Sequence, residues 1–278
     1  MVRPLFVVDA FAAAPFAGNP AAVVLPEDGP GGATSHAWAP DAWLAAVAAE
    51  MNLSETAFPR PRPDGAWDLR WLTPTVEVDL CGHATLATAH VLLETGRVPA
   101  GSPIRFHTRS GPLVARRRPD GWIELDLPAD PVRSIDPPPG LEEALGARPV
   151  FVGSGAANLL VELATAAAVR ALRPDQGWLA TAIPDGLIAT APGDEPGVAI
   201  VSRYFCPAAG IPEDPVTGSA HCALAPFWAP RVGATFRAVQ ASTRGGLLDV
   251  ALRGDRVRVA GAAVTVVRGE LVAQEEHP

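Results

Sequence analysis

Two short segments of this sequence have the residue types and spacing of an anion-binding site. Cys81-Gly82-His83-Ala84 and Thr217-Gly218-Ser219-Ala220 each have a glycine as the second residue and stand directly before an apolar run. Glycine lets the backbone approach a ligand closely, and the first N–H groups of a helix lack intrahelical partners. Both segments are therefore predicted to open helices whose N-termini can hold carboxylates or other anions.

One carboxylate, Glu55 in the segment NLSETAF, has the residue type needed for general acid/base chemistry. The second half of the chain repeats landmarks of the first, but the shift that carries Arg70 onto Arg203 carries Glu55 onto Ile188 in GLIATAP. A base that removes a carbon-bound proton needs a pKa near the working pH, and burial would raise the pKa of Glu55 toward neutrality. We therefore expect two similar halves that are chemically unequal.

The repeat is visible at three separate places. Arg70 starts a run that reads basic, aromatic, aliphatic, small and proline, and Arg203 starts the same order in the second half. The two glycine segments are separated by nearly the same length of chain, and so are Asn19, which precedes an apolar run, and its echo Asn158. Three landmarks with nearly one spacing indicate a duplicated unit. We place the first domain at residues 1–118 and the second at residues 119–278.

The elements that must position these residues are strands and one enclosed helix in each half. The segment 84–94 (ATLATAHVLLE) and the segment 220–228 are apolar on nearly all sides, which is typical of a helix surrounded by other structure. Pro226 is expected to end or kink the second helix early. Strands are predicted at residues 5–9, 21–25 and 67–72, from their apolar or alternating patterns.

A further helix is predicted in the first half. Leu44, Val47, Ala48 and Met51 fall at i, i+3, i+4 and i+7. Asp41 is placed to cap its start, and Asn52 is expected to end it.

Composition excludes some functions and disfavours others. The 278 residues hold 22 arginines and no lysine, so neither a pyridoxal-phosphate imine nor a Schiff-base aldolase is possible. The net charge of −8 argues against a nucleic-acid partner. No apolar run reaches membrane-spanning length, and three scattered cysteines with no leader segment favour a cytoplasmic location. No metal or other cofactor is expected, because no histidines stand at a zinc-like spacing.

Four separated segments carry a resemblance to a known family. VVDAFAAAPFAGNPAAVVL, NLSETAF, DLCGHATLATAHVLLETG and GIPEDPVTGSAHCALAPFW resemble, in order and across both halves, the signatures of the phenazine-biosynthesis (PhzF-like) isomerases, which are related to the diaminopimelate epimerases. The resemblance implies an α/β (α+β) fold of two pseudo-symmetric domains. Each would be a curved, mostly antiparallel sheet around a central helix, with the active site in the interdomain cleft, a homodimeric assembly and a last strand that can cross back to the first domain.

The resemblance also implies roles for single residues, motif by motif. Glu55 matches the family's general acid/base, and Ser54 and His83 match neighbours that contact the substrate. Gly82 and His83 at the first helix match donors to a substrate carboxylate or oxyanion, as do Gly218 and Ser219 at the second. Asp214 matches a carboxylate that positions polar substituents of the substrate and tunes the proton transfer. The implied reaction is a cofactor-independent proton shift on a small carboxylate-bearing substrate, similar to that of trans-2,3-dihydro-3-hydroxyanthranilate isomerase.

Two alternatives stay open. Diaminopimelate-type epimerases use two cysteines, at the positions that match Cys81 and Thr217, so Cys81 could act as acid or base at its helix N-terminus. Only one of the two positions holds a thiol here, and Cys81 could equally be a packed apolar residue. The second alternative is a non-catalytic protein that binds a small acid, because helix ends can hold an anion without transforming it.

Overall fold

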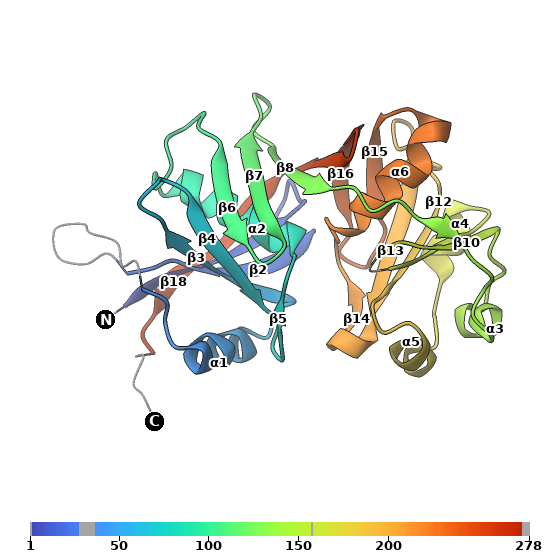
Figure 1. Ribbon diagram of the computed structural model, residues 1–278, viewed down its shortest axis with the longest axis horizontal. Helices are drawn as coiled ribbons and strands as arrows, with labels where there is room; N and C mark the ends of the chain where they lie inside the picture. Colours follow the sequence, from blue (N-terminus) through green and yellow to red (C-terminus); the bar gives the residue numbers. More distant parts are fainter. Residues whose placement is uncertain (1, 28–36, 157, 274–278) are drawn as a thin grey trace. The chain divides into compact units, whose positions relative to one another are not determined.

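The structure is a computed structural model that describes residues 2–27, 37–156 and 158–273. It is a mixed α/β protein, mostly sheet with few helices, and it divides into two compact units (Figure 1). The first unit runs up to Asp126 and takes in the described residues from Gly261 onward, and the second is Leu127–Ala260. The first unit extends past the predicted boundary at residue 118 because the turn at that point joins two paired strands.

The elements of each unit follow in chain order. In the first unit they are β1 (Arg3–Ala10), β2 (Asn19–Val24), α1 (Asp41–Met51), β3 (Glu55–Pro61), β4 (Trp67–Leu72), β5 (Glu77–Val78), α2 (Gly82–Glu94), β6 (Ile104–Thr108), β7 (Gly111–Arg117) and, from the end of the chain, β18 (Ala263–Leu271). The boundary lies within β8 (Ile123–Pro128). In the second unit they are β9 (Arg133–Ser134), α3 (Leu141–Leu145), β10 (Phe151–Ser154), β11 (Leu159–Glu162), α4 (Ala166–Ala171), α5 (Gln176–Ala182), β12 (Leu187–Pro192), β13 (Ile200–Cys206), η2 (Pro207–Ala209), β14 (Ile211–Asp214), α6 (Ala220–Val232), β15 (Thr235–Gln240), β16 (Gly246–Arg253) and β17 (Arg256–Gly261).

Both units have the same order of strand pairing. In the first, β18, β1 and β2 pair antiparallel in that order, β2 runs parallel to β3, β3 pairs antiparallel with β4, and β4 runs parallel to β6. In the second, β9, β10, β11, β12, β13 and β15 repeat this order with the same directions. Two antiparallel pairings, β6–β7 and β15–β16, extend the repeat. The duplication predicted from three sequence landmarks is therefore a duplication of topology.

The helix α2 is the core of the first unit. It packs against β1, β2, β3, β7 and β18, and every residue from Gly82 to Ala89 is buried. Such a helix cannot be amphipathic, because sheet meets it on nearly all sides. Its all-round apolar sequence predicted this environment.

The helix α6 occupies the same place in the order of the second unit, and it corrects one prediction. Pro226 does not end the helix, which continues to Val232 and contains Pro230 as well. A proline removes one N–H and leaves the carbonyl four residues earlier without its helical partner. That carbonyl belongs to Cys222, and it accepts a hydrogen bond of 2.9 Å from the backbone N–H of Asp130. An outside donor therefore replaces the missing helical one.

The outer helix α1 covers the other face of the first unit's strands. In Figure 1, α1 lies on the side of its sheet away from α2, and it buries Leu44, Val47 and Ala48 against β3 and β4. Asn52 ends the helix in the left-handed conformation, as predicted. Asp41 does not cap it: Asp41 is the first helical residue, and its carboxylate accepts a hydrogen bond from Arg70.

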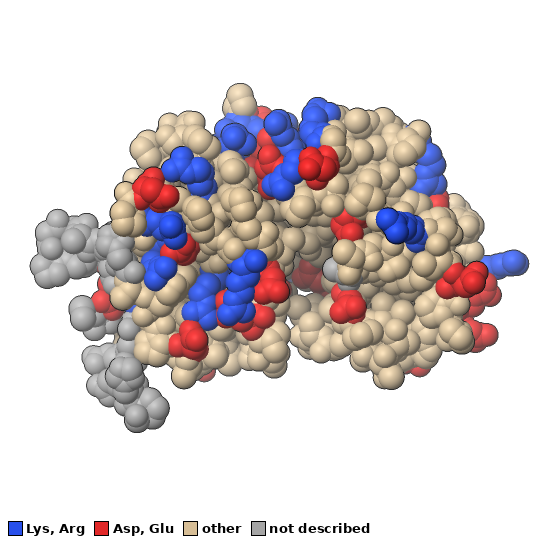
Figure 2. Space-filling view, in the orientation of Figure 1, with Lys and Arg blue, Asp and Glu red and all other residues tan. Residues whose placement is uncertain are grey.

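Arginines on the surface lie beside acidic side chains. Figure 2 shows blue and red groups interspersed on one face of the molecule, with no broad region of one sign. Arg170, for example, binds both Asp194 and Glu195, at 2.7 and 2.8 Å. Within the described residues, no helix is long and apolar enough to cross a membrane.

Candidate active site

Glu55 opens β3, and the strand pairing sets the direction of its side chain. Ala21 of β2 pairs with Glu55 in parallel register, so Asn19, two residues before Ala21, projects to the same face of the sheet as Glu55. This face meets the first turn of α2. Glu55 is only 9% exposed, so the carboxylate is buried rather than solvated.

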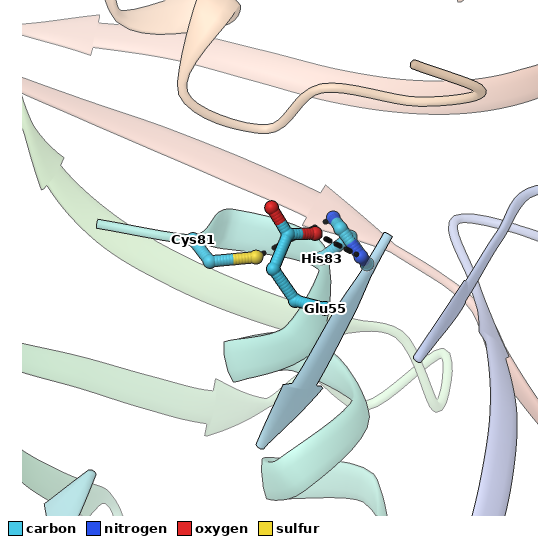
Figure 3. A group of neighbouring side chains, drawn as sticks. All are labelled: Glu55, Cys81 and His83. Carbon is cyan, nitrogen blue, oxygen red and sulfur yellow. Dashed lines mark hydrogen bonds and ion pairs between the residues drawn. The ribbon is translucent and has the colours of Figure 1, made fainter. Parts of the chain in front are cut away.

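The N-terminus of α2 brings two more functional groups to Glu55. Nε2 of His83 lies 3.1 Å from Oε2 of Glu55, and Sγ of Cys81 lies 3.5 Å from Nδ1 of His83 (Figure 3). Nδ2 of Asn19 also lies 3.0 Å from Nδ1 of His83. The imidazole of His83 is therefore contacted at both of its nitrogens by three different side chains.

His83 is a neutral imidazole in this environment. Complete burial lowers the pKa of His83 to about 3, because the charged ring would lose its hydration. A neutral imidazole carries one N–H, and a carboxylate can only accept. The 3.1 Å approach of Nε2 to Oε2 of Glu55 lacks hydrogen-bond geometry, but a carboxylate oxygen this close still favours the proton on Nε2 over a lone pair there.

The three side chains Glu55, Cys81 and His83 also include the donor types of a metal site, and their ligand atoms lie within 4.8 Å of one another. A metal ion coordinates one nitrogen of an imidazole. Here Glu55 approaches Nε2 while Cys81 approaches Nδ1, so the two side chains lie nearest to different nitrogens of the ring.

The helix start also supplies backbone donors. Among the described residues, no acceptor is found for the backbone N–H groups of Gly82, His83 and Ala84, and the first intrahelical bond joins Thr85 to the carbonyl of Cys81. Such groups carry the positive end of the helix dipole. They can bind an anion beside the Glu55 carboxylate.

The second unit assembles a different polar group at the start of α6. The Thr217 hydroxyl donates a short hydrogen bond to Oδ2 of Asp214, and the carboxamide of Gln240 holds the same turn. Oε1 of Gln240 accepts from the Thr217 N–H at 2.8 Å, and Nε2 donates to the Asp214 carbonyl at 2.8 Å and to the Thr217 hydroxyl at 3.1 Å. Gly218 and Ser219 follow this turn directly. Thr217 is thus committed to a structural network, whereas its counterpart Cys81 contacts an imidazole.

One helical position has the same structural role in the two units but a different residue. Oγ1 of Thr85 donates to the carbonyl of Cys81, and Nδ1 of His221, also four residues into the motif, lies 2.9 Å from the carbonyl of Thr217. Burial lowers the pKa of His221 to about 4, so this imidazole is neutral as well. The His221 side chain contacts the backbone of the Thr217 turn directly before α6.

The second unit has no carboxylate at the counterpart of Glu55. Leu160 pairs with Ile188 as Ala21 pairs with Glu55, and Ile188 is fully buried. The strand partners of Arg70 and Arg203 are Phe58 and Ala189, and the residue three positions before Ala189, as Glu55 is before Phe58, is Gly186. A Cβ at Gly186 would meet the Tyr204 hydroxyl at 2.3 Å. Neither Ile188 nor Gly186 supplies a carboxylate.

The structure places the predicted site residues in two groups. Glu55 and His83 are in direct contact, Gly82 precedes His83 at the helix start, and Cys81 joins them. Asp214, Gly218 and Ser219 belong to the second unit, around the start of α6. Ser54 is half-buried directly before β3, and among the described residues its hydroxyl has no hydrogen-bond partner.

Sequence reasoning missed Asn19 and Gln240, the two amides that hold His83 and Thr217. In the sequence, Asn19 stands out only as a landmark of the repeat. Gln240 lies far along the chain, at the end of β15, and its only sequence signal is a polar residue closing an otherwise apolar strand. The polar atoms of a fully buried amide are expected to form hydrogen bonds, and both Oε1 and Nε2 of Gln240 do so.

Comparison with known proteins places this fold and these residues in a family. The family model for phenazine biosynthesis-like proteins (PhzC-PhzF) matches residues 8–269. An uncharacterized isomerase of Halalkalibacterium halodurans is 46% identical, over 98% of this chain and 99% of its own, and one of Pseudomonas aeruginosa is 47% identical, over 95% and 96%. A crystal structure of a PhzF family protein from Enterococcus faecalis, 38% identical, superposes with a TM-score of 0.89 over 98% of this chain and all of its own. The chain therefore belongs to the phenazine biosynthesis-like (PhzC-PhzF) family.

Proposed function

We propose that this protein is an isomerase that moves a proton within a small carboxylate-bearing substrate, with Glu55 as the only general acid/base. The relatives named as isomerases, which match nearly the whole chain, support the reaction class. The single observation that supports the mechanism is the buried Glu55 side chain, whose carboxylate lies 3.1 Å from the imidazole of His83 at the start of α2.

We assign separate tasks to the two oxygens of Glu55. Oε2 lies 3.1 Å from Nε2 of His83, and Figure 3 shows the other oxygen directed away from the imidazole. The second oxygen removes a proton from a carbon of the substrate and returns it at another position. His83 does not compete for the proton, because its low pKa keeps it neutral throughout the physiological range.

Charge that develops on the substrate must be stabilised while Glu55 holds the proton. The N–H groups of Gly82, His83 and Ala84 at the start of α2 are oriented in advance, which makes them suited to an oxyanion or a carboxylate. In the second unit, the N–H groups of Gly218 and Ser219 supply donors of the same kind. Asp214, oriented by Thr217, binds polar substituents of the substrate.

One base explains a proton shift, whereas inversion of a stereocentre needs a second base on the opposite face. Cys81 is the first-unit thiol that could take part, since its Sγ lies 3.5 Å from His83. The low pKa of His83 makes this imidazole a weak base for activating a thiol. Burial raises the pKa of Cys222 to about 12, so Cys222 stays a protonated core residue.

Solvent hydrogen exchange tests the proposal. Candidate small acids incubated with the native protein in deuterated water should gain deuterium at carbon, detected by mass spectrometry and NMR. Glu55→Gln should lower the labelling rate by about 10²-fold to 10⁴-fold, because it removes the general base. Glu50→Gln, an exposed substitution on α1, serves as the matched control and should leave the rate unchanged.

Two outcomes separate the alternatives. If an acid binds, by calorimetry, and no label enters with native protein, the protein is a binding protein for that ligand and the isomerase proposal fails for it. Cys81→Ser should slow labelling less than about tenfold if the thiol only packs beside His83. A loss as large as that of Glu55→Gln would instead favour thiol-assisted epimerisation.

A further inference from the structure

Asn19 contacts His83 at Nδ1, whereas Glu55 approaches Nε2. Its side chain is fully buried, and its Nδ2 lies 3.0 Å from Nδ1 of His83. The backbone at this point is fixed by Gly18, which has a φ of +66° and whose Cβ, if it had one, would meet the Ala10 carbonyl at 2.2 Å. Only glycine can take this conformation so close to the neighbouring strand. Gly18 therefore fixes the backbone conformation directly before β2, and the Asn19 side chain lies beside His83.

We infer that Asn19 is a positioning residue that sets the tautomer of His83 and thereby places the imidazole proton on Nε2, the ring nitrogen that Glu55 approaches. The inference rests on the proposed function and extends it to a residue that touches neither Glu55 nor, on this view, the substrate. Asn19 acts through the imidazole.

The contacts on the two sides of the ring require the same tautomer. An amide Nδ2 can only donate, so Nδ1 of His83 must be the unprotonated nitrogen. The thiol of Cys81, 3.5 Å from the same atom, can also donate to it. At the second ring nitrogen, the nearby Glu55 carboxylate favours a proton on Nε2. In the other tautomer an unprotonated Nε2 would lie 3.1 Å from a carboxylate oxygen, which is electrostatically unfavourable.

The repeated unit provides a matched control. Asn158 stands at the equivalent place in the second half, but its Oδ1 accepts a hydrogen bond of 2.9 Å from the Tyr204 hydroxyl instead of contacting an imidazole. The two asparagines share a position in the fold and differ in what they hold. A change at Asn158 disturbs the second unit in a comparable way without touching His83.

Nitrogen NMR of protein labelled at histidine tests the inference directly. In native protein the His83 signals, assigned with a His83→Gln variant, should be those of a neutral ring protonated at Nε2. Asn19→Asp, which keeps the shape of the side chain but offers Nδ1 an acceptor, should move the proton to Nδ1 or give a doubly protonated ring. Glu55 and Cys81 are the ionisable side chains in contact with this ring among the described residues, and both stay unchanged in the variant.

Activity gives a second reading. Asn19→Asp and Asn19→Leu should lower kcat for isotope exchange by about 10-fold to 100-fold, as expected when the partner that orients a functional histidine is lost. Asn158→Leu should leave both kcat and the His83 spectrum as they are in native protein.

The outcomes separate this inference from the proposed function. A native His83 protonated at Nδ1, or an unchanged spectrum in Asn19→Asp, overturns the inference whatever the activity. The native spectrum alone is decisive if the variants do not fold. A tautomer that changes as expected in a protein that labels no substrate supports the inference and contradicts the proposed function.

Discussion

The two units share their scaffold and differ in their chemistry. Arg70 on β4 forms two hydrogen bonds with Glu77 on β5, and Arg203 on β13 forms the same pair with Glu213 on β14. Strand order and the enclosed helix repeat as well. Around each helix start, by contrast, the side chains are different.

The difference teaches which parts of the fold are free to change. The first unit uses its helix start for an imidazole, a thiol and a carboxylate, while the second uses it for a hydroxyl held by an amide and an acid. A threonine and a histidine do the same structural task at the second turn. The frame that offers backbone N–H groups is retained, and the carboxylate at the position of Glu55 is present in the first unit and not in the second.

The largest expected effect lies in the shared scaffold. Arg203→Ala should lower the free energy of unfolding by about 3 kcal/mol, because Arg203 is nearly buried and also donates to the carbonyls of Val169 and Leu172 at the end of α4. Arg70→Ala should cost about 1 to 2 kcal/mol, since one of its partners, Asp41, is largely exposed. Urea unfolding of both variants checks the order. Equal losses of unfolding free energy in the two variants would show that the carbonyl contacts of Arg203 do not contribute to stability.

A smaller effect is expected at the position that replaces Cys81 in the second unit. Thr217→Val keeps the shape but leaves Asp214 and Gln240 without their shared partner, which should cost about 2 kcal/mol. Thr217→Ser retains the hydroxyl and should cost much less. Urea unfolding monitored by circular dichroism measures the free energy of unfolding of both variants. Equal values for Thr217→Val and Thr217→Ser would show that the network does not stabilise this turn.

The smallest effect concerns the two buried imidazoles. The pKa values of His83 and His221 are lowered to about 3 and about 4, so the unfolded chain binds protons below about pH 6.5 that the folded protein does not. Stability is therefore full above that pH and falls as the pH decreases, by up to about 1.4 kcal/mol per pH unit for each histidine. His221→Thr, which copies Thr85, should make this slope shallower between pH 6 and 4. Above pH 7.5 the slopes of the two proteins should coincide, and a difference there would contradict this origin.

Sequence alone predicted the repeat and the enclosed helices, because these depend on local pattern and on short motifs. It failed at Pro226, where the helix continues because a distant backbone donor, at Asp130, meets the freed carbonyl. It failed at Asp41, whose carboxylate accepts a hydrogen bond from Arg70 on β4 rather than capping α1. Asn19 and Gln240 could not be assigned roles, since their partners are 64 and 23 residues away. In each case the deciding interaction is long-range and leaves no periodic signal.

The most direct test of a single acid/base group follows the hydrogen itself. A substrate found by the labelling experiment is deuterated at the carbon that loses its proton and is converted in ordinary water. Because the Glu55 carboxylate is buried and carries the proton alone, we predict that part of the deuterium appears in the product at the new carbon and that Glu55→Gln abolishes this transfer. Complete loss of deuterium with inversion at the same carbon, at a rate that Glu55→Gln leaves unchanged, would contradict the mechanism.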